Sequence, residues 1–416
     1  MSSGPRLDRR LGTGDAVVIG LGSMIGAGVF AAFGPAARAA GTGLLLGLAL
    51  AAAVAYCNAT ASAQLAAQYP ESGGTYVYGR ARLGDWWGFL AGWAFVVGKT
   101  ASCAAMALTF AAYAVPPAWE RPAAVGAVVA LVAVNYRGIT RTARLTRVLL
   151  AVVLTALAVA LLAGFSGGAA DASRLADWSA GPDGWYGVLQ AAGLLFFAFA
   201  GYARIATLGE EVRDPARTIP RAIPLALGLA VATYAVVAVM LLVALGPGGI
   251  AGSETPLADA AASWGWAAPI VRVGAAAAAL GALLGLVAGI GRTGLAMART
   301  GDLPRWLAAV HPRHRVPHRA ELALGAVVCA LVLTVDLRAA IGFSSFGVLL
   351  YYLVANVAAY TQDAGSRRWP RALQVAGAAG CVVLAATLPW TSVVAGILVL
   401  AAGAIYRGLR LRRGRA

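Results

Sequence analysis

The chain has 416 residues, of which 60% are hydrophobic and only 12% are charged. An average soluble domain carries about 25% charged residues, so this chain has too few charges to cover a water-soluble surface. The composition excludes a soluble enzyme, a nucleic-acid-binding module and a disordered protein, and it predicts an all-α polytopic membrane protein. The net charge of +16 comes from 32 arginines and a single lysine, Lys99, against 17 acidic residues.

Apolar stretches of the length of a membrane helix, about 20 residues, follow one another along the chain. Twelve helices are predicted within residues 16–37, 39–70, 86–119, 122–136, 148–170, 184–203, 222–253, 273–291, 322–335, 339–362 and 372–406, the last stretch holding two helices around Pro389. The stretches 122–136 and 322–335 are short, which leaves ten or eleven spans as an alternative. Because no polar loop is long enough for a soluble domain, residues 1–416 are predicted to form a single membrane domain.

The arginines alternate with the predicted helices. If the N-terminus is inside the cell, the segments predicted to be cytoplasmic hold 25 arginines, and the segments predicted to be external hold five. Cytoplasmic loops carry an excess of Lys and Arg, so both termini are predicted to be cytoplasmic. The basic face is expected to contact anionic membrane lipids. No nucleic acid and no obligatory protein partner are inferred.

Two of the predicted helices are interrupted by glycine. The first contains four glycines in the nine residues from Gly20 to Gly28, and the sixth contains Gly201 midway along its length. Broken helices at matching positions of two halves are typical of transporters with inverted repeats, whose substrate site lies at the breaks. The alternative is that the small residues only allow close helix packing.

A broken helix offers groups that suit a zwitterion. Its second half begins with unpaired N–H groups and its first half ends with unpaired C=O groups, and the helix dipoles make these ends partly positive and partly negative. An α-amino acid carries both charges on one carbon. The predicted donors are the amides of Ala27 and Gly28, and the predicted acceptors are the carbonyls of Met24, Phe197 and Ala200. The full predicted substrate-binding set is Ser23, Met24, Ile25, Gly26, Ala27, Gly28, Phe197, Ala198, Phe199, Ala200 and Gly201.

Four segments, in chain order, resemble the amino acid–polyamine–organocation (APC) permeases. GSMIGAGVF (22–30) is similar to their first-helix signature, and PESGGTYVYGRARLG (70–84) to their first cytoplasmic loop. FFAFAGYARIATLGEEVRDPARTIPRAI (196–223) resembles their sixth helix and the loop after it. MARTGDLPRWLAAVHPRHRVPHRA (297–320) resembles their loop between helices eight and nine.

The resemblance implies a LeuT-like fold of twelve helices with a 5+5 inverted repeat and broken helices 1 and 6. Repeat one would cover about 12–166, repeat two about 184–362, and helices eleven and twelve about 372–406. The implied function is secondary active transport of amino acids across the plasma membrane by alternating access. The resemblance also implies that Phe197 is the gate that closes over bound substrate.

Lys99 is the predicted coupling residue. Many proton-coupled APC permeases carry a lysine in helix five, where the alignment places Val153. Lys99 lies 15 residues after Gly84, about 22 Å along a helix, in a part of the membrane where an ionisable group usually serves a site or pathway. Because burial disfavours the charged form of an amine, Lys99 is predicted to carry the coupling proton or to supply a fixed charge in place of sodium. The alternative is a lysine that binds helix-end carbonyls.

Other functions are also open. An exchanger or exporter of amino acids is the main alternative to uptake, and a channel or a transporter-like sensor is less favoured. An enzyme is not expected, because the predicted spans contain no histidine and almost no acidic residues, and no catalytic residue or cofactor is predicted. No metal is predicted either, because His311, His314 and His318 lie in an arginine-rich loop without nearby cysteines or paired carboxylates. Arg204, which follows the sixth-helix break, is predicted to pair with Glu210 or Glu211, or alternatively to attract an acidic substrate.

Overall fold

The structure is a computed structural model, and it describes residues 11–71, 73–138, 143–168, 170–176, 180–209 and 211–413. These residues form helices and connecting loops without any strand, apart from one isolated β-bridge between Leu11 and Val212. The prediction of an all-α protein is therefore confirmed.

The first half of the chain contains α1 (Thr13–Met24), α2 (Ala27–Ala31), α3 (Phe33–Ala40), η1 (Gly41–Gly43), α4 (Leu44–Gln68), α5 (Thr75–Leu83), α6 (Asp85–Ala114), η2 (Pro117–Trp119), α7 (Glu120–Tyr136), α8 (Ala143–Ser166) and η3 (Ala172–Leu175). The second half contains α9 (Gly184–Phe199), η4 (Ala200–Tyr202), α10 (Ala203–Ala206), α11 (Pro215–Gly252), α12 (Pro256–Ala260), α13 (Ala267–Arg299), η5 (Arg305–Ala308), α14 (His318–Thr334), α15 (Leu337–Tyr360), α16 (Arg371–Ala386) and α17 (Trp390–Arg413).

Ten segments of the described chain are long and apolar enough to cross a membrane. Two further helices are shorter: α14 has 17 residues and α16 has 16. The multi-pass architecture is thus confirmed, whereas the count of twelve stays a prediction that includes both short helices.

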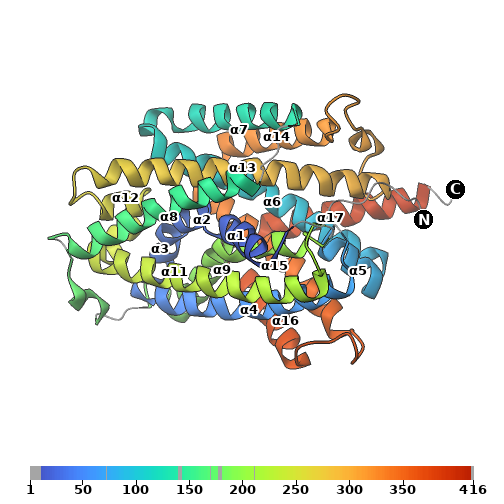
Figure 1. Cartoon of the computed structure of the whole chain (residues 1–416), viewed down its shortest axis with the longest axis horizontal. Coiled ribbons are helices and arrows are strands. Elements are labelled where there is room, and N and C mark those ends of the chain that lie inside the picture. Colours follow the sequence, from blue (N-terminus) through green and yellow to red (C-terminus); the bar gives the residue numbers. More distant parts are fainter. Residues whose placement is uncertain are drawn as a thin grey trace.

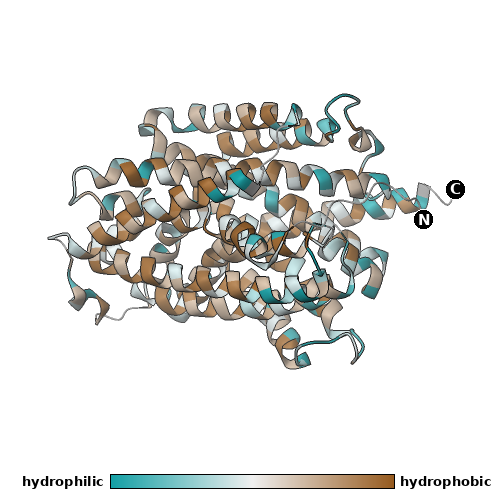
Figure 2. Ribbon diagram, viewed as in Figure 1, coloured by the Kyte–Doolittle hydropathy of each residue, from teal (hydrophilic) through white to brown (hydrophobic). Residues whose placement is uncertain are grey.

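The long helices run roughly along the longest axis of the molecule (Figure 1). Helix α5 and the C-terminal end of α17 lie at one end, and α12 lies at the other; we call these the α5 end and the α12 end. Hydrophobic residues dominate the middle of the helices, and hydrophilic residues gather toward the ends, most densely at the α5 end (Figure 2). The broken segments α1, α2 and α9 lie in the centre, with α4, α6, α11, α13 and α15 around them (Figure 1).

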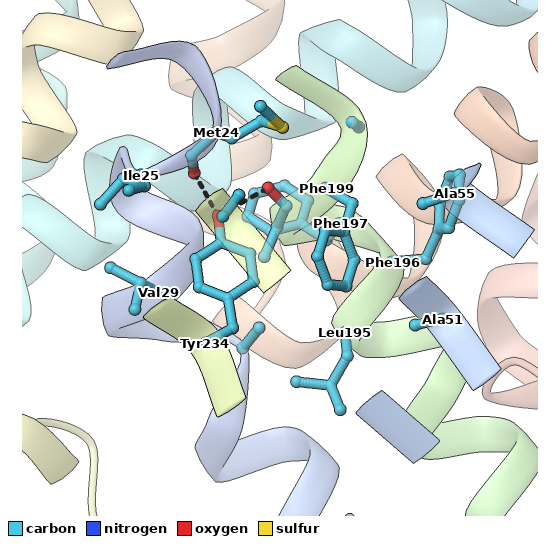
Figure 3. Packing of buried hydrophobic residues seen from close by; sticks show 14 of the residues in the cluster. Met24, Ile25, Val29, Ala51, Ala55, Leu195, Phe196, Phe197, Phe199 and Tyr234 are labelled. Carbon is cyan, nitrogen blue, oxygen red and sulfur yellow. Dashed lines mark hydrogen bonds between the residues drawn. The ribbon is translucent and has the colours of Figure 1, made fainter. Parts of the chain in front are cut away.

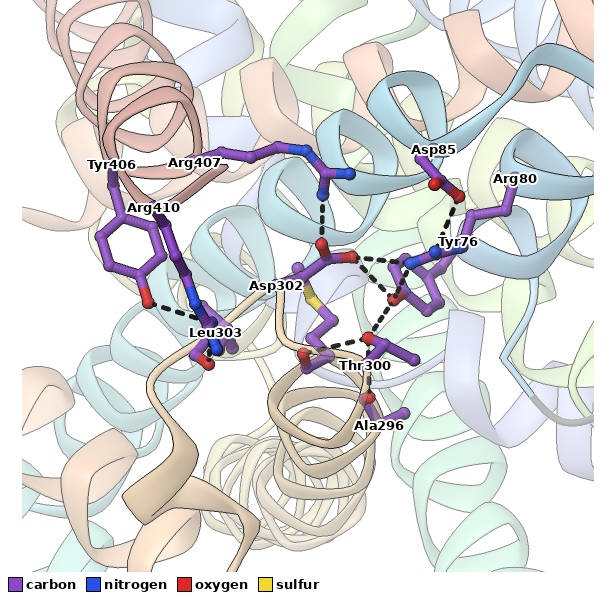
Figure 4. A network of polar contacts seen from close by, with 11 residues as sticks. Tyr76, Arg80, Asp85, Ala296, Thr300, Asp302, Leu303, Tyr406, Arg407 and Arg410 are labelled. Carbon is purple, nitrogen blue, oxygen red and sulfur yellow. Dashed lines mark hydrogen bonds and ion pairs between the residues drawn. The ribbon is translucent and has the colours of Figure 1, made fainter. Parts of the chain in front are cut away.

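A buried ion network joins distant segments at the α5 end (Figure 4). The Asp302 carboxylate accepts hydrogen bonds from the Tyr76 hydroxyl (2.8 Å) and from Arg80 (3.0 Å), and it pairs with Arg407. The side chains of Asp302 and Arg407 are only 6% and 7% exposed. Burial raises the pKa of Tyr76, so its hydroxyl stays protonated and can donate. Through Asp302 the network links α5, the loop after α13, and α17.

The two broken helices are also joined at this end through the backbone. The amide of Leu11 donates to the carbonyl of Glu211 (3.1 Å), and the amide of Arg213 donates to the carbonyl of Leu11 (2.9 Å). Just inside α1, Asp15 pairs with Arg147 of α8 at 3.1 Å. The start of α1 is therefore held beside the loop that follows α10.

Candidate functional site

The first helix is broken where the glycine pattern predicts. Helix α1 ends at Met24, and Ile25 leaves the helical conformation with φ −78° and ψ 49°. Gly26 follows in a conformation that is neither helical nor extended, with φ −97° and ψ −138°, and α2 begins at Ala27. The amides of Ala27 and Gly28 thus lie in the first turn of a new helix, where α-helical amides have no internal acceptor.

The sixth predicted helix changes conformation near Gly201. Helix α9 ends at Phe199, a 3₁₀ turn covers Ala200–Tyr202, and α10 continues from Ala203. The amide of Ala200 donates to the carbonyl of Phe197, as expected for a tightened turn. The first predicted interruption is therefore a break in the helix, whereas at Gly201 the helix tightens into a 3₁₀ turn and continues.

Glycine lets the two breaks touch. A Cβ atom added to Gly28 would lie 2.7 Å from the Cα of Ala198, and one added to Gly201 would collide with the carbonyl of Ser23. Gly26 has more room, since a Cβ there would lie 3.2 Å from the Cβ of Ala282 on α13. The structure therefore brings the predicted residues of α1, α2, α9 and η4 together, and Gly28 and Gly201 serve the helix packing that the sequence left as an alternative.

Tyr234 of α11 connects the breaks (Figure 3). Its hydroxyl lies 2.6 Å from the carbonyl oxygen of Met24 and 3.0 Å from that of Ala198, so its single proton is shared between these two acceptors. Its ring packs against Phe199 with a centroid distance of 5.0 Å. Tyr234 was not singled out from the sequence, although a tyrosine in an apolar helix needs a partner for its hydroxyl.

The three predicted carbonyl acceptors all receive a hydrogen bond from the protein in this structure. The carbonyl of Met24 is bonded by Tyr234, that of Phe197 by the amide of Ala200, and that of Ala200 by the hydroxyl of Tyr352 on α15 at 3.4 Å. The glycine pattern thus identified backbone carbonyls that need hydrogen-bond donors, and tyrosine hydroxyls from α11 and α15 supply two of these donors.

The remaining predicted residues line the same region. The hydroxyl of Ser23 donates to the carbonyl of Ile19 one turn earlier (2.8 Å) and is used within its own helix. Ile25 and Phe197 are buried, and Figure 3 shows both in the cluster around Tyr234. Phe197 is 7% exposed.

Lys99 is buried in α6 with 8% of its surface exposed. It forms no hydrogen bond or ion pair within the part of the chain that the structure describes. It interacts electrostatically with Cys103, one turn further along α6. Helix α6 packs against α13 and α15 and also contacts α2. The alternative in which Lys99 binds helix-end carbonyls therefore has no counterpart among these residues.

Arg204 lies exposed on α10 and donates to the hydroxyl of Thr207 at 3.2 Å. Among the residues with described positions it has no ion pair with Glu211, and Glu210 lies outside them. The same residues contain no group of three or more His, Cys, Asp or Glu arranged to hold a metal ion.

Broken helices in backbone contact at the centre of an apolar bundle define a class: the protein is a multi-pass membrane transporter. The family model for amino acid permeases matches residues 11–408. The chain belongs to the amino acid permease family, and it is a transporter rather than an enzyme.

The relatives agree with this assignment. The chain is 63% identical over 406 residues to an uncharacterised transporter of Mycobacterium tuberculosis, a match that covers 97% of this chain and 92% of that protein. It is 28% identical to the branched-chain amino acid permease of Bacillus subtilis, with 98% and 94% coverage. It is 30% identical to the human cationic amino acid transporter 4, with 83% and 58% coverage.

Proposed function

We propose that the protein is a secondary active transporter that moves amino acids across the plasma membrane by alternating access, with both termini cytoplasmic. The observation that carries the proposal is the meeting of the α1–α2 break and the α9–η4 turn, with Tyr234 bonded to both. Helix ends with unpaired backbone groups are tolerated inside a membrane only where they face protein, water or a ligand. Here they would alternate between protein donors and substrate.

The substrate would bind at this junction. Its carboxylate would accept from the amides of Ala27 and Gly28, at the positive end of α2. Its ammonium would donate to the carbonyls of Met24 and Ala200, which the hydroxyls of Tyr234 and Tyr352 bond in this structure. A bound amino acid would thus replace hydrogen bonds that the protein makes to itself.

The proposed fold is the LeuT-like one, with helices of repeat one in residues 12–166 and of repeat two in 184–362. Within it we assign Phe197 as the gate that closes over substrate and Lys99 as the residue that couples transport to protons. The buried position of Lys99 without a described carboxylate partner supports a role other than a structural ion pair. Exchange or export of amino acids is the alternative mode.

Uptake into proteoliposomes tests the proposal. Labelled leucine, alanine, arginine and glutamate would be compared with and without a proton gradient. Accumulation of at least one amino acid that collapses when the gradient is dissipated would support proton-coupled transport. Counterflow without accumulation would favour an exchanger, and no movement of any labelled amino acid in either direction would refute the proposed function.

A further inference from the structure

The α12 end contains a cleft of about 400 Å³ that is separate from the helix breaks. Its volume falls in the range of about 300–1,000 Å³ that is typical of small-molecule sites. The lining comes from the end of α6, the start of α7, the loop before α12 and the start of α13. Its polar and charged lining residues are Tyr113, Glu120, Glu254, Thr255 and Arg272.

One lining residue, Tyr113, contacts α2, which is the second half of the first broken helix. Tyr113 is 2% exposed and donates from its hydroxyl to the carbonyl of Phe30 at 3.2 Å. The two rings meet edge to face with a centroid distance of 5.7 Å. Because Phe30 belongs to α2, a molecule in the cleft would be separated from the breaks by this aromatic pair.

Two acidic side chains, those of Glu120 and Glu254, line the same cleft. Their negative charges act on each other across the cleft. Neither has an ion pair among the residues that the structure covers. Two carboxylates held together repel unless a proton or another cation lies between them, so this pair is suited to an ammonium group.

An arginine with unused donors lines the same cleft. Arg272 is exposed and donates to the backbone carbonyl of Tyr113 at 3.4 Å. It has no carboxylate partner in the described ranges. Since a guanidinium carries five N–H donors in a planar fork, Arg272 can still bind a carboxylate.

The rim that carries Glu254 is held in place by hydrogen bonds. The hydroxyl of Ser253 bonds to the carboxylate of Asp259, and the amide of Thr255 donates to Ser253 at 3.0 Å. The hydroxyl of Thr255 bonds to the other carboxylate oxygen of Asp259 at 3.3 Å. Glu254 therefore lies in a hydrogen-bonded part of the loop before α12, whereas Glu120 is held at the start of α7.

We propose that this cleft is an external binding site for a zwitterionic amino acid, whose ammonium lies at Glu120 and Glu254 and whose carboxylate lies at Arg272. The inference rests on the proposed function, because it takes the α12 end as the external face. The site would hold the amino acid outside the Tyr113–Phe30 pair before it moves to the helix breaks. The site would recognise the α-ammonium and α-carboxylate groups of the amino acid and not its side chain.

Protection from thiol labelling tests the site in the full-length protein in intact cells. Ala114→Cys places a thiol in the lining, and Ala262→Cys, which is exposed in the loop after α12 and is not a lining residue, is the matched control. A membrane-impermeant thiol reagent should label both. L-leucine should protect only the Ala114→Cys thiol, whereas isoamylamine and 4-methylpentanoate, which each keep one of the two charged groups, should protect at least tenfold less well.

The charged residues are tested in the same background. Arg272→Gln and Glu254→Gln should each raise the leucine concentration for half-protection at least tenfold, while Asp183→Asn, an exposed acid outside the cleft, should not change it. Labelling only from the cytoplasmic side, equal protection by the amine alone, or unchanged protection in both variants would overturn the inference. Uptake is measured separately: protection without uptake refutes the proposed function, and uptake without protection refutes this site.

Discussion

The hydroxyl of Tyr234 lies 2.6 Å from the carbonyl oxygen of Met24, at the residue where α1 ends. Tyr234 is 210 residues away in the chain and belongs to α11. The same hydroxyl reaches Ala198 near the end of α9 at 3.0 Å. One hydroxyl therefore lies within hydrogen-bond distance of carbonyls on both broken helices, and any change in the distance between the breaks must alter how its proton is shared.

Tyr234→Phe should weaken this connection. A buried carbonyl left without a donor costs about 1–3 kcal/mol, so the thermal unfolding temperature of the purified protein should fall and the rate of substrate exchange should change several-fold. Tyr56→Phe is the matched control, because Tyr56 is 44% exposed. Equal unfolding temperatures and equal exchange rates in the two variants would show that the hydrogen bond to Met24 contributes to neither stability nor transport.

Substitutions at two nearby glycines should separate packing from substrate binding. Gly28→Ala places a methyl group 2.7 Å from the backbone of Ala198 and should reduce the yield of folded protein, because backbone atoms must move. Gly26→Ala meets only the Cβ of Ala282 at 3.2 Å, so it should fold and lose substrate affinity. Gly126→Ala, with open space around it, is the control. Size-exclusion profiles and substrate binding measure the two effects, and wild-type affinity in Gly26→Ala would argue against a backbone site.

Phe197→Ala should impair transport more than insertion. The ring is almost fully buried beside the breaks, and its loss would leave the occluded state without its proposed lid. Phe165→Ala, at a ring that is 45% exposed, should leave transport unchanged. Uptake per inserted molecule is the measurement, and wild-type kinetics in Phe197→Ala would place the gate elsewhere.

Lys99→Ala and Lys99→Arg should distinguish a titrating group from a fixed charge. If Lys99 carries the coupling proton, both variants lose accumulation driven by a pH gradient, while exchange down the substrate gradient continues. Because arginine stays charged, activity in Lys99→Arg alone would indicate a fixed charge. Accumulation by Lys99→Ala with an unaltered pH dependence would exclude Lys99 from coupling.

Asp302→Asn should destabilise the α5 end. It leaves Arg407 buried without its carboxylate, and breaking a buried ion pair costs about 3–5 kcal/mol. Asp363→Asn is the control, since that carboxylate is 81% exposed and lies 3.6 Å from Arg82. Exposed pairs contribute about 0–1 kcal/mol. The unfolding temperature should fall only in Asp302→Asn, and equal temperatures would contradict a stabilising role for the network.

The sequence by itself determined the features that depend on local composition. Apolar stretches of about 20 residues have the length of a membrane-spanning helix rather than of a strand, which determined the all-α, multi-pass class. The glycines from Gly20 to Gly28 and at Gly201 weaken the helix at those positions, so the breaks could also be predicted. The four matching segments, in the same order along the chain, were sufficient to predict the family.

The tertiary structure decided which groups meet across the breaks. The hydrogen bonds of Tyr234, the contact between Gly28 and Ala198, and the pairing of Asp302 with Arg407 join residues far apart in the chain. Hydropathy and spacing describe each helix alone, whereas these contacts depend on how the helices cross and rotate against one another. A helix break predicts that polar backbone groups need partners; only the packing of α11 and α15 decides that tyrosine hydroxyls supply them.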